Sequence, residues 1–144
     1  MILGVGTDIV DIRRVEKLHI QFKDKFLDRL LHEKERRDAK ISKHNKRPHF
    51  YAHLAKRHAA KEAVAKALGT GIGRHVSFTE VIILNHESGQ PYVVLKGNAA
   101  KRLNELTPLG MVGQVDISLS DDFPYAQAFA VLSAVVQENA PAGT

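Results

Sequence analysis

The sequence feature that most constrains the fold is a helical segment running from Phe50 to Leu68. The segment is rich in Ala, Lys, Glu and Leu, contains neither Gly nor Pro, and ends at Gly69. One of its faces is made mostly of small side chains, at Leu54, Ala59, Ala63 and Ala67. Because small side chains allow close approach, we expect another part of the chain to pack tightly against this helix.

Shorter elements are expected on both sides of the long helix. Runs of β-favouring apolar residues predict strands at residues 2–10, 81–84, 92–95, 112–120 and 126–136. Helical spacing predicts short helices around residues 13–18, 22–31 and 97–106, and turns are expected at residues 86–91 and 121–124. This order predicts an α+β fold with a mostly antiparallel sheet packed on one long helix and shorter helices.

The chain length of 144 residues suits one compact domain. We place that domain at residues 1–137 and expect residues 138–144 to form a loose tail. The segment from Glu33 to Arg47 is highly charged and nearly free of large apolar side chains. We therefore expect a solvated helix or a mobile loop there.

The composition excludes several classes of protein. The chain has no cysteine, which rules out disulfides, thiolate metal sites and thiol catalysis. No apolar run is long enough to cross a bilayer, and the N-terminus lacks the basic stretch and cleavage site of a signal peptide, so we expect a cytoplasmic protein. The net charge of +5 favours acidic partners such as nucleic acid, anionic membranes, phosphorylated small molecules or an acidic protein, without choosing among them.

Two carboxylates, Asp8 and Glu62, are candidate ligands for a magnesium ion, which prefers one or two carboxylates together with phosphate oxygens and water. Asp8 ends an apolar strand, and Glu62 shares a helix face with His58 and Lys66. Taken alone, Asp8 is better explained as a helix N-cap or a turn residue. Glu62 is better explained as the partner of Lys66 in an i, i+4 pair that contributes ~0.2–0.5 kcal/mol. The pair becomes informative only if the fold brings the two carboxylates together.

Other polar groups give weaker signals. The backbone N–H groups of Gly69-Thr70-Gly71 could face a phosphate, although Gly69 is already explained as the C-cap of the long helix. The eight histidines form no HExxH pattern, and Ser118 and Ser120 lie in no Gly-x-Ser-x-Gly motif, so a zinc enzyme and a serine hydrolase are disfavoured. The basic residues of the N-terminal third form either a solvated surface or a docking face for an acidic helix: Arg13, Arg14, Lys17, Arg29, Arg36 and Arg37.

Four segments, taken together, resemble the holo-acyl-carrier-protein synthase family, the small 4'-phosphopantetheinyl transferases. The first, Gly4 to Ile12, contains Gly-Thr-Asp, and the second, Ala55 to Ile72, runs from Lys-Glu-Ala to Gly-Thr-Gly. The third is Gly89-Gln90-Pro91 between two predicted strands, and the fourth is Ser118 to Asp122 before a strand of small residues. Their order and spacing agree with the family over residues 1–136.

The resemblance implies a 4'-phosphopantetheinyl transferase-like fold and a magnesium-dependent reaction. In that reaction 4'-phosphopantetheine moves from coenzyme A to a serine of apo acyl carrier protein, and adenosine 3',5'-bisphosphate is the other product. The resemblance places this reaction in fatty acid biosynthesis. The resemblance also implies a homotrimer with active sites between subunits, and no nucleic-acid or membrane partner.

Roles for individual residues follow from the same resemblance, position by position. Asp8 and Glu62 would bind magnesium, which also holds the pyrophosphate of coenzyme A. Lys66 would stabilise the leaving phosphate, and Glu62 could accept the serine proton. The residues implied to contact coenzyme A are Arg57, Lys66, Gly69, Thr70, Gly71 and Pro91. Arg13 and Arg14 match the place where the family docks the carrier protein.

Two positions depart from the family pattern. Asp121 follows the Ser-x-Ser motif where many relatives have histidine, and a carboxylate cannot act as a cationic phosphate contact. His58 stands one turn before Glu62, where Phe is usual. We interpret His58 as a packing substitute, in preference to a pH-sensitive neighbour of the site.

Two other functions stay open at this point. A non-catalytic nucleic-acid-binding domain would explain the basic charge, but the sequence has no helix-turn-helix, zinc-finger or RNP pattern and few aromatic residues. A magnesium-dependent nucleotide hydrolase would use the same two carboxylates without any carrier protein.

Overall fold

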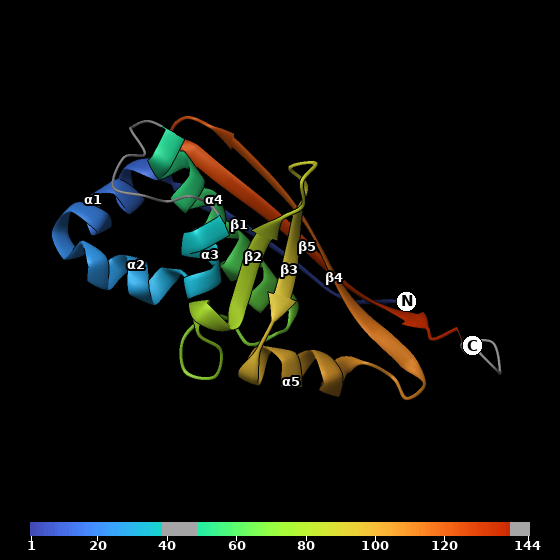
Figure 1. Ribbon diagram of the computed structural model, residues 1–144. Helices are drawn as coiled ribbons and strands as arrows, with labels where there is room; N and C mark the ends of the chain where they lie inside the picture. Colours follow the sequence, from blue (N-terminus) through green and yellow to red (C-terminus); the bar gives the residue numbers. More distant parts are fainter. Residues whose placement is uncertain (39–48, 139–144) are drawn as a thin grey trace.

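The computed structural model describes residues 1–38 and 49–138 of the chain. Its helices are α1 (Ile12–Phe22), α2 (Asp24–Leu30), α3 (Glu33–Asp38), α4 (His49–Ala67) and α5 (Gly97–Leu106), with one 3-10 turn, η1 (Phe78–Glu80). Its strands are β1 (Ile2–Asp11), β2 (Val81–Asn85), β3 (Pro91–Leu95), β4 (Met111–Asp122) and β5 (Tyr125–Val136). Figure 1 shows α4 running through the middle of the molecule, with the other elements around it.

The main sheet is antiparallel, with the strand order β1-β5-β4, and one of its faces packs on α4. The central strand β5 turns a row of buried residues toward the helix: Ala126, Ala128, Ala130, Leu132 and Ala134. On β1, Gly4 and Gly6 approach α4 so closely that a β-carbon would overlap the carbonyl oxygens of Ala67 and Ala63. The predicted close packing on the small-residue face of the long helix is confirmed.

The remaining elements enclose α4 on its other sides. The strands β2 and β3 form an antiparallel hairpin, and the residues of β2 from Val81 to Leu84 are buried. The short helices α1 to α3 lie together on one side of α4, and α5 lies near the end of the β2–β3 hairpin (Figure 1). Val15 and Leu27 bring α1 and α2 into the same hydrophobic core as Leu54 of α4.

The opposite face of the main sheet carries exposed apolar side chains. The residues that alternate with the buried ones on β1 and β5 point away from α4, and several of them are large. The exposed members of this face are Val5, Ile9, Val112, Tyr125, Phe129 and Val135. Such a face suits burial against another protein surface.

The predicted strands and helices are confirmed, most of them with shifts of one or two residues at their ends. The helix predicted around residues 13–18 is longer than expected and extends to Phe22. Asp121 and Asp122, which were expected in the turn, instead end strand β4, so that only Phe123 and Pro124 separate it from β5. The extension follows from pairing, since both residues lie in register with residues of β5.

Of the two alternatives for Glu33 to Arg47, the helix is confirmed in the first part of the segment, although one of its residues is not solvated. Residues Glu33–Asp38 form α3, and Glu35 is fully buried instead of solvated. Residues 39–48 lie outside the described part of the chain, as do residues 139–144 of the predicted tail. Within residues 1–38 and 49–138, no helix is long and apolar enough to span a membrane.

Candidate active site

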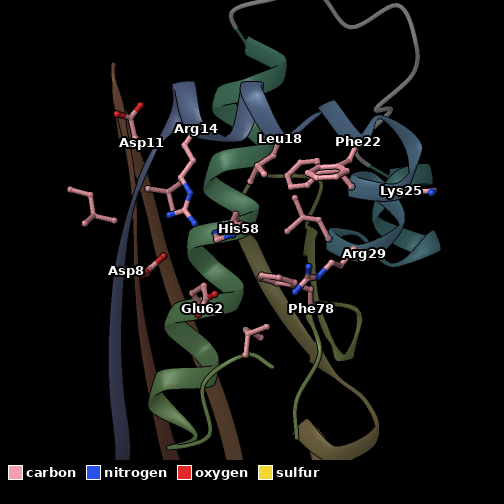
Figure 2. Close-up of a pocket in the computed structure, with 15 residues that line it drawn as sticks. Asp8, Asp11, Arg14, Leu18, Phe22, Lys25, Arg29, His58, Glu62 and Phe78 are labelled. Atoms are coloured by element: carbon pink, nitrogen blue, oxygen red, sulfur yellow. The ribbon is translucent and has the colours of Figure 1, made fainter. Parts of the chain in front are cut away.

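Asp8, Glu62 and Lys66 come together where β1 packs on α4. Asp8 lies two residues after Gly6 on β1, so its side chain is on the same strand face, the one that packs on the helix. Lys66 Nζ donates to Asp8 Oδ1 and to the backbone oxygen of Thr7, each at 3.0 Å. In Figure 2, Asp8 projects from β1 toward the part of α4 that carries Glu62. The fold thus unites three predicted site residues from two elements.

The electrostatics of Glu62 reflect this arrangement. Burial raises the pKa of its carboxyl, and the nearby Asp8 carboxylate raises it further, whereas Lys66 and Arg14 act in the opposite direction. Two partly buried carboxylates that repel each other are stabilised by a shared cation. The Asp8 side chain keeps 17% of its surface exposed, so a ligand can still reach it.

The two carboxylates suit a magnesium ion that is completed by its substrate. Among the residues the structure describes, no three His, Cys, Asp or Glu side chains form a group that could hold a metal by themselves. Magnesium takes one or two carboxylates and fills its other positions with phosphate oxygens and water. The donor set of Asp8 and Glu62 therefore matches a metal bound together with a phosphorylated substrate.

A cavity of about 710 Å³ lies beside these carboxylates. Asp8, Asp11, Glu62 and Arg14 form most of its polar side, and Lys25 and Arg29 add positive charge from α2 (Figure 2). Most of its apolar lining comes from α1, α2 and η1: Leu18, Phe22, Phe26, Leu30 and Phe78. This combination suits a ligand that has a phosphate at one end and a largely uncharged chain at the other.

His58 lines the same cavity, one turn before Glu62 on α4. Its ring lies against that of Phe78, with 5.1 Å between the centroids and 47° between the planes. Burial lowers the pKa of His58, so the ring is uncharged at neutral pH, and its Nδ1 has no hydrogen-bond partner in the described residues. This ring contact supports the interpretation of His58 as a packing residue.

Arg57 and Pro91 lie apart from the carboxylates, at the end of the β2–β3 hairpin where the turn joins the two strands. Arg57 is 4% exposed, and its Nη2 donates to Asn85 Oδ1. Asn85 is in turn paired with Pro91 across the hairpin. Burial lowers the pKa of Arg57, and its Nε has no partner among the described residues. Neither Arg57 nor Pro91 lines the cavity beside Glu62.

The Gly69-Thr70-Gly71 loop ends α4, as predicted for Gly69. The chain turns at Gly69, which has a φ of 78°, and the N–H groups of Gly69 and Thr70 donate to the carbonyls of Lys66 and Ala65 at 3.0 and 3.1 Å. These two bonds form a Schellman cap. Gly69 and Thr70 also border a separate hollow of about 390 Å³ together with basic groups of α5, Lys101 and Arg102.

A buried ion pair between Lys61 and Glu35 was not predicted. Both side chains are fully buried, and Lys61 Nζ lies 2.5 Å from Glu35 Oε1. Burial lowers the pKa of Lys61 to about 8, against the opposing effect of the Glu35 carboxylate. Lys61 precedes Glu62 directly, but it faces α3 and η1 instead of β1. Neither residue carries a sequence signal that separates it from surface charge.

Arg13 and Arg14 are neighbours with different surroundings. Arg13 forms a two-pronged ion pair with Asp11, with Nε–Oδ1 and Nη2–Oδ2 distances of 3.0 and 2.7 Å. The hydrogen bond from Arg13 lowers the pKa of Asp11 to about 2. Arg14 lines the cavity instead. Of the two, Arg14 is the cation that is better placed for a partner at the cavity.

Asp121, the first of the two departures noted in the sequence, lies beside a lysine of α4. Lys56 Nζ is 3.0 Å from Asp121 Oδ1, and both side chains are partly exposed. A cation is therefore present next to this position even though the residue itself is a carboxylate.

Comparison with known proteins identifies close relatives. The family model of the 4'-phosphopantetheinyl transferase superfamily matches residues 4–127. A holo-[acyl-carrier-protein] synthase from Rhodopseudomonas palustris (strain BisB5) is 45% identical over 136 residues, which cover 94% of this chain and 96% of the relative.

Solved structures agree with this result. The crystal structure of holo-[acyl-carrier-protein] synthase from Neisseria meningitidis has a TM-score of 0.77 and 36% identity, covering 92% of this chain and 99% of that one. A holo-(acyl-carrier-protein) synthase from Bacillus anthracis, in complex with CoA (3',5'-ADP), has a TM-score of 0.71 and 36% identity, covering 92% of this chain and 96% of that one. The fold predicted from the resemblance is therefore confirmed.

Proposed function

The chain belongs to the 4'-phosphopantetheinyl transferase superfamily, and on that basis we infer that it acts as a holo-[acyl-carrier-protein] synthase. It transfers 4'-phosphopantetheine from coenzyme A to a serine of apo acyl carrier protein. The serine oxygen bonds to the phosphorus next to the pantetheine arm, the pyrophosphate bond breaks, and adenosine 3',5'-bisphosphate leaves. The observation that carries this function is the meeting of Asp8, Glu62 and Lys66 beside a cavity with apolar walls.

The transfer depends mainly on alignment and charge neutralisation, as is general for phosphoryl transfer. Asp8 and Glu62 are the residues that would hold magnesium, which supplies neutralisation of the pyrophosphate charge. Lys66, now bonded to Asp8, is positioned to turn toward a bound phosphate and stabilise the leaving group. Glu62 is also positioned to accept the serine proton, directly or through a water molecule.

The nucleotide end of coenzyme A is assigned to the second group of residues. The guanidinium of Arg57 is buried, and its one described hydrogen-bond partner is the neutral amide oxygen of Asn85. A buried cation of this kind binds an anion strongly, so we assign Arg57 to a nucleotide phosphate. Pro91 lies next to Asn85 in the hairpin and would contact the nucleotide. Gly69, Thr70 and Gly71 are assigned to the same nucleotide through the resemblance alone.

We also propose a homotrimer with active sites between subunits. The carboxylates line a cavity that Arg57 and Pro91 do not reach, so two chains would supply the two ends of one site. The exposed apolar face of the main sheet offers a surface for that association. Phe129 lies on the central strand of this face, between Thr7 of β1 and Ser118 of β4.

The carrier protein is assigned to the basic surface of α1. Arg13 and Arg14 lie in the first turn of this helix, and Arg14 lines the cavity into which the serine would be delivered. An acidic carrier helix would be attracted by this charge. We further propose that the protein works in the cytoplasm in fatty acid biosynthesis, with no nucleic-acid or membrane partner.

The direct test is mass spectrometry of an apo carrier protein after incubation with the enzyme, coenzyme A and magnesium. The expected result is a gain of about 340 Da, the mass of the transferred group. Release of nucleotide from coenzyme A without any carrier protein would instead indicate a hydrolase. A steep salt-dependent affinity for DNA that coenzyme A does not change would indicate the nucleic-acid-binding alternative.

A further inference from the structure

The ammonium group of Lys61 makes three hydrogen bonds inside the protein. Its Nζ donates to Glu35 Oε1 at 2.5 Å, to the backbone oxygen of Leu30 at 2.6 Å and to that of Phe78 at 2.9 Å. An ammonium has three N–H donors, so these bonds use all of them. The lysine is fully buried, and its bonds join α4 to three separate elements.

Two of these bonds end on the walls of the cavity beside Glu62. Leu30 is the last residue of α2 and Phe78 is the first residue of η1, and both line that cavity. The third bond reaches Glu35, which also accepts from the N–H of His32 and so fixes the start of α3. Figure 2 shows Phe78 on the side of the cavity away from β1, facing the helix that carries Glu62 and His58.

Stability alone does not explain such a pair. Removing two charges from water costs as much as their attraction returns, and well-packed apolar residues of similar volume often serve the fold equally well. A tetrahedral ammonium also constrains its surroundings, because its three N–H bonds fix the positions of the three acceptor oxygens around it. Here two of those acceptors belong to cavity walls, and the donor directly precedes a site residue in the chain.

We propose that Lys61 is a positioning residue, which holds Leu30 and Phe78 at fixed places relative to Glu62 and so sets the shape of the cavity for the reacting groups. This inference rests on the proposed function, since the reacting groups are the pantetheine arm and the serine of the carrier protein. Lys61 touches neither of them and acts through the two walls. Misplacement of reacting groups by a fraction of an ångström to one ångström is enough to slow a reaction strongly.

The test is a double variant, Glu35→Met with Lys61→Met, compared with the wild-type protein. Both charges leave together, so no buried charge remains unpaired, and we expect the variant to fold and to unfold near the wild-type temperature. The bonds to the two walls are lost, so we expect kcat to fall about tenfold or more. The KM for coenzyme A should stay within about threefold, because Arg57 and Lys66, which bind its phosphates, are unchanged. Lys96→Met, which changes an exposed lysine at the start of α5, serves as the matched control.

The outcomes separate the inference from the proposed function. A folded double variant with wild-type kcat refutes the role of Lys61, and a wild-type protein that leaves the carrier unmodified refutes the proposed function itself. If the double variant fails to fold, Glu35→Gln with Lys61→Gln decides, because neither side chain is charged and the amide at residue 61 has only two N–H donors for three acceptors. A tenfold loss of kcat in that folded protein supports the role of Lys61, and a wild-type kcat overturns it.

Discussion

Gly6 of β1 lies directly against the backbone carbonyl of Ala63 in α4. A β-carbon at Gly6 would overlap that carbonyl oxygen, and the equivalent contact joins Gly4 to Ala67 one turn later. The strand can therefore approach the helix only where both lack large side chains. Because Asp8 follows Gly6 on the same strand face, this close approach also brings its carboxylate to Glu62 and Lys66.

Substitution of Gly6 by alanine should destabilise the protein. The added methyl group meets backbone atoms of α4, which cannot rotate away, so the strand and the helix must separate. We expect a loss of about 2 kcal/mol or more in the free energy of unfolding. Chemical denaturation measures the change, with Ser88→Ala in the exposed turn of the β2–β3 hairpin as the control. A Gly6→Ala protein as stable as wild type would contradict the tight contact.

Glu62→Gln should remove most of the transferase activity and leave the fold intact. The amide keeps the volume of the side chain but loses the charge that is assigned to magnesium and to proton transfer. The i, i+4 attraction between the Glu62 and Lys66 charges, which the substitution removes, contributes only ~0.2–0.5 kcal/mol. The rate of holo carrier formation and the thermal unfolding midpoint are both measured, with Glu87→Gln in the exposed hairpin turn as the control. Full turnover by Glu62→Gln would refute the metal assignment.

Arg14→Ala should weaken carrier binding more than Arg13→Ala. Arg13 is already paired with Asp11 through two hydrogen bonds, whereas Arg14 faces the cavity. We expect the KM for the carrier protein to rise several-fold in Arg14→Ala, with a smaller rise in Arg13→Ala and an unchanged KM for coenzyme A. Raising the salt concentration should reduce the difference between wild type and Arg14→Ala. Equal effects of the two substitutions would show that the Asp11 pair does not matter.

The approach of Glu62 and Lys66 could be predicted from the sequence, because spacing within one helix fixes which side chains share a face. The meeting of Asp8 with them could not, since it depends on how β1 lies across α4. Periodicity alone favoured a cap for Asp8 and a surface pair for Glu62. Only the resemblance to the family, which rests on the order of the flanking motifs, assigned Asp8 and Glu62 to the same site.

The burial of Lys61 and Glu35 could not be predicted at all. Lys61 lies among other charged residues in a helix, and Glu35 lies in a segment whose composition indicates solvation. Each is buried only because the other neutralises it, and that pairing requires α3 to dock beside η1. A charge pattern within one element carries no information about a partner in another element.

His53 should make the stability of the protein depend on pH. Burial, together with the charges of Arg57 and Lys56, lowers its pKa to about 4, whereas an unfolded chain has the ordinary value near 6.5. Below pH 6.5 the unfolded state binds the proton and the folded state does not, so stability falls as the pH drops from about 6.5 toward 4. His53→Leu should lose this contribution, which is on the order of 2 kcal/mol at pH 4.5. Denaturation at pH 7 and pH 4.5 tests it, and His75→Gln, an exposed change, should keep the wild-type slope.

Phe129→Lys should convert the proposed trimer into monomers. Phe129 is 45% exposed at the centre of the apolar sheet face, so a lysine can extend into water in the single chain without disturbing the core. Three lysines brought together in a trimer would repel one another in an apolar interface. Light scattering after gel filtration should therefore give a mass near that of one 16.0 kDa chain for the variant and near three chains for wild type. Glu87→Lys, in the hairpin turn away from this face, should remain trimeric.

If active sites form between subunits, the Phe129→Lys monomer keeps Asp8 and Glu62 yet loses transfer, because Arg57 and Pro91 of another chain are no longer supplied. A fully active monomer, or a monomeric wild-type protein, would refute the shared site.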